Sequence, residues 1–417
     1  MNSSKPSSKL ALGRWSMGQV LMPAHFHAQE EALLAHLGLR LGLGGLPAHG
    51  VARLIWDDAL LAKGALSVSA LTVVLASGEL IDVPGNATIS NLNLGDVMAT
   101  EVEVYLHVLA DTQDARGIDL YREDAREVSR VIHRLTLSTQ SWLENARQSL
   151  KLAELSQGPD GGWQLGNHVP PLLQVGTTPF LTAQTMSLAR AIDALEARLG
   201  EQLADSFLGG EHLSRLRQGL AATYRMRALL LDLQGQVPLH PYQLFTALRD
   251  FYVEVCLLHA SLPEPALVAY DHDDLAGCFG ELGRRIAVRL QGHAPVSPRV
   301  PFVRVEDRFV ARPLPDAMRR AGDVYLLVQH NGRERVSLEG VKLASPGRLA
   351  RVHLNALAGV PFFKESALDF AHTFGARADL YRLARGEEWE HALREGALSF
   401  WARPDIGQVQ AALTWRA

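Results

Sequence analysis

The sequence predicts a multidomain α+β protein, and three observations along its 417 residues lead to this fold class. Up to about residue 175, short β-branched stretches are separated by turn residues; from there to about residue 292, apolar residues recur at helical spacing. The remainder mixes both patterns behind a proline-containing linker. Chains of this length usually divide into several domains. We therefore predict an N-terminal antiparallel β-sandwich shell over residues 1–175, a middle four-helix bundle over 176–292 and a small C-terminal α+β head over 293–417.

The first domain opens with a helix from about residue 25 to about residue 41, which glycines and Pro47 bring to an end. Behind it, turn residues such as Pro84-Gly85 separate short apolar stretches. Many short strands at such spacing are typical of an antiparallel sandwich or barrel. We expect the strands at residues 51–56, 65–76, 80–83, 102–110, 128–139, 149–155 and 163–165.

The middle domain begins where Thr178 and Pro179 make a plausible helix start, as N-cap and first helical residue. Apolar residues then recur every three or four positions, which gives each helix one apolar face. Short connectors between the helices favour antiparallel neighbours, and a four-helix bundle is the natural packing for them. The helices are expected near residues 179–206, 211–233, 240–261 and 271–291.

The last domain follows a linker at residues 293–298 and alternates strands with short helices. The expected strands are 300–305, 324–329 and 335–338, and the expected helices are 345–350 and 386–394. From His293 onward there are 18 Lys and Arg against 14 Asp and Glu, whereas the rest of the chain has 23 against 31. This basic bias is either ordinary surface scatter or a preference for acidic partners and anionic membranes.

Composition limits the function classes further. Hydrophobic residues make up 47% and charged residues 21%, as in globular soluble proteins, and a net charge of −4 without a basic stripe argues against nucleic-acid binding. No stretch approaches the roughly 18 apolar residues of a membrane helix, and the Ser/Lys-rich start is not a signal peptide. We expect a cytoplasmic protein that meets a membrane only through partners, with Cys256 and Cys278 as buried reduced thiols.

Motifs for catalysis are absent from the sequence. It contains no G-x-S-x-G, no Walker A loop and no H-E-x-x-H. The densest cluster, 271–274, permits a metal-dependent hydrolase that uses His272, Asp273 and Asp274. Four consecutive residues point in different directions, however, and acidic residues at a helix start are typical caps. We therefore favour the cap and predict no catalytic residue, metal or cofactor.

Short motifs in several separate places resemble, in order, those of one known family. They are Trp15 and Gly18 followed by Leu21-Met22-Pro23-Ala24-His25-Phe26 and Gln29-Glu30; GELIDVP at 78–84; VPPLLQVG at 169–176; His240-Pro241-Tyr242; YDHDDLAGCF at 270–279; LAGVP at 357–361; Leu380-Tyr381-Arg382-Leu383; and Glu388-Trp389. The chain thus resembles the TssK family, also called VasE or ImpJ, over nearly its whole length. It departs from the family at His27, where glutamine is usual, and at 362–367, where a proline-rich stretch is usual.

The resemblance implies a structural baseplate component of the bacterial type VI secretion system without enzymatic activity. TssK-like proteins are homotrimers whose shell holds a wedge of TssF and TssG and whose mobile head engages the cytoplasmic domains of TssL and TssM. Such an adaptor is recruited to the inner face of the bacterial inner membrane. The rival to this interpretation, besides the hydrolase, is a phage-type receptor-binding or tail protein with the same shell.

An assembly protein needs apolar contact surfaces, and aromatic and Met residues are their usual anchors. For the wedge we predict contacts from Trp15, Met17, Met22 and Phe26; the alternative is that these pack on their own shell. For partners of the head we predict contacts from five aromatic residues, although a small domain also needs aromatic residues for its core. These five are Phe362, Phe363, Tyr381, Trp389 and Trp401.

Overall fold

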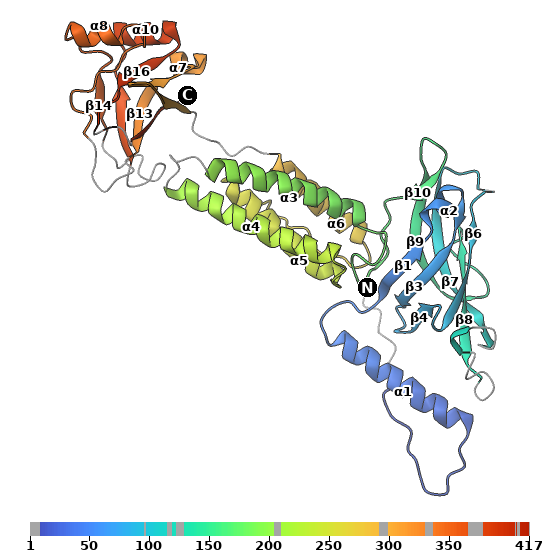
Figure 1. The fold of residues 1–417 in the computed structure, drawn as a ribbon. Coiled ribbons are helices and arrows are strands. Elements are labelled where there is room, and N and C mark those ends of the chain that lie inside the picture. The colour runs from blue at the N-terminus through green and yellow to red at the C-terminus, as the bar shows by residue number, and fades with distance from the viewer. Residues whose placement is uncertain are drawn as a thin grey trace. The chain divides into compact units, whose positions relative to one another are not determined.

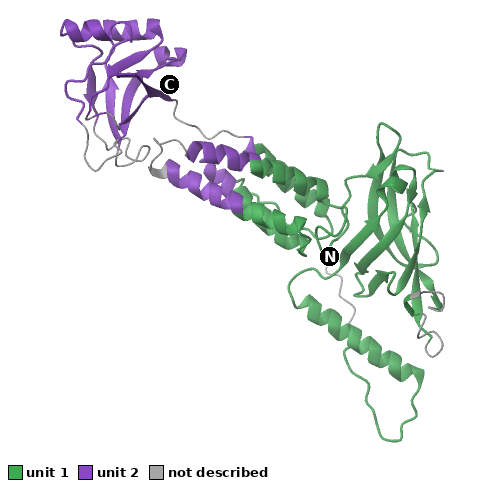
Figure 2. Cartoon of the chain, in the orientation of Figure 1, with its two compact units in different colours: residues 1–193, 225–253, 263–289 green, residues 194–224, 254–262, 290–417 purple. Residues whose placement is uncertain are grey.

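The computed structural model describes residues 9–95, 97–114, 119–121, 129–203, 210–291, 299–329, 337–365, 378–404, 406 and 409–416. Helices and strands are both abundant, so the fold is mixed α and β (Figure 1). The chain forms two compact units (Figure 2). The first comprises residues 1–193, 225–253 and 263–289, and the second comprises 194–224, 254–262 and 290–417. The division into three domains at residues 175 and 292 stays a prediction.

The first helix, α1 (Pro23–Gly42), lies where the sequence predicts it and begins two residues earlier. A proline at its first position suits a helix start because its missing N–H needs no partner there. The Met22 N–H donates to His25 Nδ1 at 3.1 Å, which satisfies one free amide of the first turn. All of α1 is described, and only Ala32 in it is buried. The helix therefore adds little to a core.

The strands of the first unit form three sheets. A three-stranded sheet has the order β1-β3-β4, a five-stranded sheet has the order β10-β9-β7-β8-β5, and β2 pairs with β6. Two short helical turns, α2 (Asp58–Ala62) and η2 (Asp119–Tyr121), lie between strands. The strand bounds are β1 Gly50–Trp56, β2 Ala65–Leu66, β3 Val68–Val74, β4 Leu80–Val83, β5 Ala87–Ser90, β6 Leu92–Asn93, β7 Glu101–Asp114, β8 Val131–Ser138, β9 Ala146–Gln157 and β10 Trp163–Leu165.

The central strand β7 explains why this part of the sequence folds as a sheet. Its Val102, Val104 and Leu106 are buried, whereas the alternating residues Glu101 and Glu103 are exposed. That alternation follows from the two-residue period of a strand, which places apolar side chains on one face. β7 pairs antiparallel with both β8 and β9, so its buried face sits in the middle of the five-stranded sheet.

The observed strands differ from the predicted ones in three respects. The predicted strand 65–76 is divided into β2 and β3. The strands β5 and β6 were not predicted, because two to four residues carry too few alternations to be recognised. The shell is also not wholly antiparallel, since β5 pairs with β8 in parallel from Ala87↔His133 to Ser90↔Thr136. A parallel neighbour needs a long crossover, which here contains β6 and β7.

Four long helices occupy the middle of the chain close to the predicted places: α3 (Thr182–Leu203), α4 (Gly210–Gln234), α5 (Pro241–Leu258) and α6 (Leu275–Leu290). The predicted start at Thr178 and Pro179 is wrong, since α3 begins at Thr182 and the Thr178 hydroxyl caps no helix. In the first unit an Asp193–Arg227 ion pair of 3.9 Å joins α3 to α4, and edge-on Phe245 and Phe279 rings join α5 to α6. In the second unit Arg198 donates to the Leu290 carbonyl, joining α3 to α6. There α4 also approaches α5 closely, because a Cβ at Gly219 would lie 2.8 Å from Leu258. Each helix thus contacts two others.

The second unit ends in a seven-stranded sheet of order β14-β15-β13-β17-β11-β12-β16. Its core includes Trp389 from α10 (Glu387–Glu395), which packs among sheet residues such as Leu326 and Leu413. The predicted helix 345–350 is observed as α8 (Leu349–Leu354), and the predicted strand 335–338 lies largely outside the described residues. The other elements are β11 Arg299–Val305, β12 Arg308–Ala311, α7 Asp316–Arg320, β13 Asp323–Gln329, β14 Phe362–Lys364, β15 Ala378–Leu383, β16 Leu398–Trp401 and β17 Gln410–Arg416.

The start of β1 is held by the double-proline motif. Val51 N–H donates to the Pro171 carbonyl and Leu173 N–H donates to the Val51 carbonyl, both at 2.8 Å. Gly50 has φ +127°, and a Cβ there would lie 2.5 Å from the Pro171 carbonyl oxygen. Only glycine combines that backbone conformation with so close an approach. We call residues 47–51 the junction segment; together with residues 43–46 it connects α1 to the first sheet.

We predict that Gly50→Ala destabilises the protein by about 2–4 kcal/mol, because it adds a steric clash to a strained backbone. Gly78→Ala is the matched control: its φ is +87° but no atom lies within 4 Å of the added Cβ, so it should cost only about 1 kcal/mol. Urea unfolding of both variants measures the difference. If both variants lose the same free energy of unfolding, the backbone at Pro171 moves away from the added Cβ without an energetic cost.

Candidate functional site

The four predicted wedge contacts lie in or beside α1, and all four side chains are exposed. Trp15 lies with its ring centroid 6.0 Å from that of Phe26 and 6.1 Å from that of His25. The three rings therefore form a small aromatic cluster at the start of α1. Met17 and Met22 extend the apolar surface in front of it. The alternative, that these residues pack on the shell, would require burial that they do not have.

One side of α1 binds the segment that precedes it, which we call the leading segment (residues 9–22). Gln29 Oε1 accepts from the Gly13 N–H at 3.0 Å, and His36 Nε2 lies 2.8 Å from the Leu10 carbonyl, to which it donates. A Lys9–Glu31 ion pair of 2.9 Å adds a third contact. Because these contacts occupy one side of α1, its other side remains uncovered.

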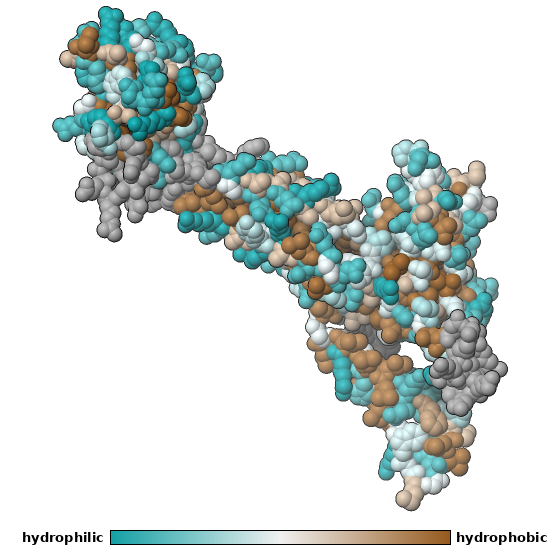
Figure 3. Space-filling model, in the orientation of Figure 1, coloured by the Kyte–Doolittle hydropathy of each residue, from teal (hydrophilic) through white to brown (hydrophobic). Residues whose placement is uncertain are grey.

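The uncovered side of α1 is lined with leucines. Leu33, Leu34, Leu37 and Leu41 are all exposed, and Figure 3 shows the apolar surface over this part of the chain. Apolar patches of this kind on a soluble protein mark contact sites. The sequence interpretation named aromatic and Met residues and missed these leucines. The sequence predicts the helix that carries them but assigns no role to its apolar face.

The five aromatic residues predicted as head contacts divide into two groups. Tyr381 and Trp389 are 8% and 2% exposed and belong to the core of the second unit. For these two the core alternative holds, because a small sheet needs bulky side chains between its strands and helices. Phe362 and Trp401 are half-buried against core residues, whereas Phe363 is 59% exposed. Phe363 is thus the member of the set best placed to contact a partner.

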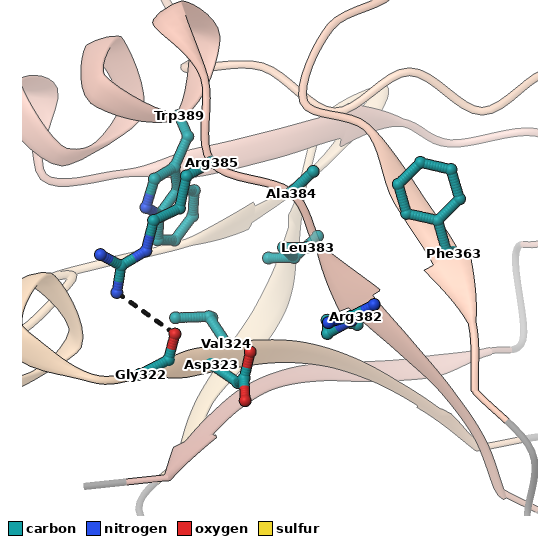
Figure 4. Close-up of a pocket in the computed structure, with 9 residues that line it drawn as sticks. All are labelled: Gly322, Asp323, Val324, Phe363, Arg382, Leu383, Ala384, Arg385 and Trp389. Atoms are coloured by element: carbon teal, nitrogen blue, oxygen red, sulfur yellow. Dashed lines mark hydrogen bonds between the residues drawn. The ribbon is translucent and has the colours of Figure 1, made fainter.

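A hollow of about 290 Å³ lies beside Phe363. Figure 4 shows Phe363 on one side of it and Trp389 with Arg385 on the other, with Ala384 and Leu383 between them and Arg382 below Phe363. Arg382 forms an ion pair of 2.9 Å with Glu365, and Arg385 donates to the Gly322 carbonyl at 3.4 Å. Arginine and aromatic residues are enriched at protein interfaces, so this surface suits protein contact.

The acidic cluster at 271–274 is arranged as a cap. Asp274 Oδ1 accepts from the Gly277 N–H at 2.9 Å at the start of α6, and Asp271 Oδ1 accepts from the Asp273 N–H at 3.0 Å. The capping role that the sequence predicts is confirmed. Within the described ranges, no group of three or more His, Cys, Asp or Glu side chains is arranged to hold a metal ion.

His272, the proposed ligand of the hydrolase alternative, has both ring nitrogens engaged. Its Nε2 donates to the His49 carbonyl at 2.8 Å, and its Nδ1 lies 2.8 Å from the Tyr270 hydroxyl. Burial raises the pKa of Tyr270, so its hydroxyl keeps the proton and donates it to Nδ1. Burial also lowers the pKa of His272 and favours the neutral ring that this pattern requires. A metal would have to displace one of these two partners.

His240 has the same bonding pattern. Its Nδ1 accepts from the Tyr242 N–H at 3.1 Å, and its Nε2 lies 3.2 Å from the Pro47 carbonyl. A backbone N–H can only donate and a carbonyl can only accept, so the neutral ring must carry its proton on Nε2. Burial lowers the pKa of His240 as well. The two histidine rings are stacked with centroids 5.6 Å apart, and both donate to the junction segment.

Among the helices that the structure describes, none combines the length and apolar character needed to cross a bilayer. Both cysteines are buried and unpaired, in agreement with the sequence prediction.

A family model described as bacterial type VI secretion, VC_A0110, EvfL, ImpJ and VasE matches residues 25–130 and 111–415. No curated protein sequence matches the chain. A crystal structure of TssK is similar with a TM-score of 0.54 and 18% identity, over 98% of this chain and 100% of that one. A chain of the baseplate complex from the type VI secretion system is similar with a TM-score of 0.55 and 20% identity, over 98% of this chain and 100% of that one. A chain of the TssK-TssF-TssG baseplate subcomplex is similar with a TM-score of 0.54 and 21% identity, over 68% of this chain and 100% of that one. These likenesses show a shared fold.

We predict that acidification lowers the thermal stability of the protein through His240 and His272. Their pKa values in the folded chain lie below the ordinary 6.5, so the unfolded chain binds more protons below that pH. Their contribution is therefore fully present above about pH 6.5 and is lost as the pH falls below it, by at most about 1.4 kcal/mol per pH unit for each ring.

Melting temperatures measured between about pH 7.5 and about pH 5 test this dependence. The double variant His240→Gln, His272→Gln should show a shallower pH profile, because glutamine does not titrate. His27→Gln, at an exposed site away from both rings, is the control for the loss of a histidine as such. A double variant with the wild-type profile would contradict the assignment to these two rings.

Proposed function

The chain belongs to the bacterial type VI secretion family of VC_A0110, EvfL, ImpJ and VasE, and from this membership we propose that it is a structural baseplate component. The observation that carries the proposal is the family match over residues 25–130 and 111–415, in order and over nearly the whole chain. The shared fold with TssK structures supports the same assignment. The role is non-catalytic, since assembly depends on contact surfaces and not on reactive groups.

The more specific role is that of a homotrimeric adaptor. One of the similar structures is a TssK-TssF-TssG baseplate subcomplex, which supports TssF and TssG as partners of this chain. The other partners are the cytoplasmic domains of TssL and TssM, which bring the adaptor to the inner face of the bacterial inner membrane. The chain itself acts in the cytoplasm and meets the membrane only through them.

The proposed surfaces divide between the ends of the chain. The leading segment and α1 present Trp15, Met17, Met22 and Phe26 to the TssF–TssG wedge, as part of a shell over residues 1–175. The four helices over 176–292 support the trimer. The head over 293–417 presents Phe363, together with Arg382 and Arg385, to the membrane complex. This division is supported by where exposed apolar side chains occur in the two units.

We predict that Met17→Asp weakens binding to a purified TssF–TssG complex by about tenfold or more, because it places a charge in an apolar contact. Met98→Asp is the matched control, since Met98 is 99% exposed in the same unit and lies outside the leading segment. Light scattering gives the mass of each variant alone, and surface plasmon resonance gives its affinity for the wedge.

Three results would contradict this proposal. A wild-type chain that ignores TssF–TssG would remove the wedge role and favour the phage-type tail protein. A monomeric mass would remove the homotrimer. Equal losses in both methionine variants would move the wedge contact away from the leading segment.

We predict that Phe363→Asp abolishes binding to the cytoplasmic domains of TssL and TssM but leaves TssF–TssG binding unchanged. The side chain is exposed, so the substitution should not disturb the core of the second unit. Leu354→Asp is the control, because Leu354 is 88% exposed at the end of α8 and outside the hollow. Pull-downs with both partner sets measure the effect. A Phe363 variant that still binds TssL and TssM would show that the head uses another surface.

A further inference from the structure

We propose that His240 and His272 are positioning residues, whose Nε2 protons hold the Pro47 and His49 carbonyls and so fix where α1 and the leading segment are presented. One consequence, that TssF–TssG binding depends on the position of α1, rests on the proposed function. It adds a specific role for two motif segments of the sequence, His240-Pro241-Tyr242 and Tyr270-Asp271-His272, which the function above does not use.

The position of α1 depends on the junction segment. The helix buries only Ala32 of its own residues. In the described part of the chain, the hydrogen bonds of α1 side chains go to the leading segment or to α1 itself. These contacts move with the helix and cannot fix it on the shell. What orients α1 is therefore the chain connection that leaves it and reaches β1.

Histidines contact one side of the junction segment. Pro47 and His49 are two residues apart, and the carbonyl of each faces the Nε2 of a histidine ring. On that side the stacked rings of His240 and His272 stand 5.6 Å apart with an interplanar angle of 11°. Each ring donates to one carbonyl, at 3.2 Å and 2.8 Å. The spacing of the rings thus matches the spacing of the carbonyls.

The double-proline motif contacts the segment at its other end. Gly50 approaches the Pro171 carbonyl so closely that no side chain fits, and Val51 N–H donates to that carbonyl. The next residue of β1 is also hydrogen-bonded, since Thr177 Oγ1 donates to the Ala52 carbonyl at 2.6 Å. Between these contacts the junction segment has few ways to move. Loss of the histidine contacts would leave its first half with the exposed contact of His49 Nε2 to Asp273 Oδ1 at 3.2 Å, and would loosen α1 with it.

Histidine suits this task because one neutral ring both donates and accepts. His240 accepts from the Tyr242 N–H at the start of α5 while it donates to Pro47, and His272 accepts from Tyr270 while it donates to His49. His240 thus connects the junction segment to the start of α5, and His272 connects it to Tyr270, whose ring centroid lies 5.4 Å from that of Phe245 in α5. Glutamine has an acceptor and a donor and can replace this pattern in part, whereas phenylalanine keeps the volume and loses both bonds.

The test uses the full chain with spin labels at Leu34→Cys in α1 and Leu80→Cys in β4, both exposed positions of the first unit. The two native cysteines are buried and remain unlabelled. Double electron–electron resonance then measures the distribution of distances between α1 and the shell. We expect one narrow distribution in the wild type and a width increased by about twofold or more in His240→Phe, His272→Phe, with recovery in His240→Gln, His272→Gln.

His168→Phe is the matched control. His168 is also a half-buried ring that donates from Nε2 to a backbone carbonyl, that of Lys151 at 3.2 Å, but it does not contact the junction segment. If the loss of any half-buried histidine broadened the distance distribution, His168→Phe would broaden it as much as the phenylalanine double variant does. An equal broadening in His168→Phe, an unchanged width in the phenylalanine double variant, or no recovery with glutamine would each overturn the proposal.

Wedge affinity gives a second measurement on the same variants. If α1 is correctly oriented for only a fraction of the time, the apparent affinity falls by that fraction, so about tenfold weaker TssF–TssG binding is expected for the phenylalanine double variant. Unchanged binding beside a broadened distribution would overturn the link between positioning and wedge contact. A wild type that does not bind TssF–TssG would refute the proposed function instead, and the distance measurement would still decide the positioning role.

Discussion

The main-chain polar groups of residues 47–51 need partners at the point where the chain passes from a helix into a sheet. A buried carbonyl or amide without a hydrogen bond costs about 1–3 kcal/mol, so this demand is large beside the net stability of a domain. Two histidine side chains meet it from 193 and 223 residues further along the chain, and Pro171 meets it from the end of the shell. Because these partners precede α3, α5 and α6, the same few bonds also fix where the helices start relative to β1. The order of the first unit depends on this junction.

Apolar side chains are used differently in the two units. In the second unit the sheet and its helices bury most of their large apolar residues, Tyr381 and Trp389 included, and Phe363 is left at the surface. In the first unit the sheets have a buried core, but α1 turns five leucines to solvent. Burial of apolar area is the main driving force of both folding and association. An element that buries so little of its own surface therefore adds little to the stability of the isolated chain.

The sequence was sufficient for elements that repeat their pattern. The four long helices show one apolar face over several turns, and β1, β4 and β10 are bounded by turn residues, so their positions agree closely with expectation. The short strands β5 and β6 carry no such repetition. Local sequence also identified 271–274 as a cap, but it could not connect His272 with the carbonyl of His49, because a contact across 223 residues leaves no local pattern. Nor could composition distinguish Trp389 in a core from Phe363 at a surface, since both are large and apolar.

The exposed leucines of α1 also affect the solubility of the free chain. A free molecule that shows such a surface associates with any other apolar surface it meets, including that of another free copy. Its solubility therefore depends on how soon the surface is covered after synthesis. In our proposal the wedge covers these leucines, so synthesis of the chain in excess of the wedge favours aggregation.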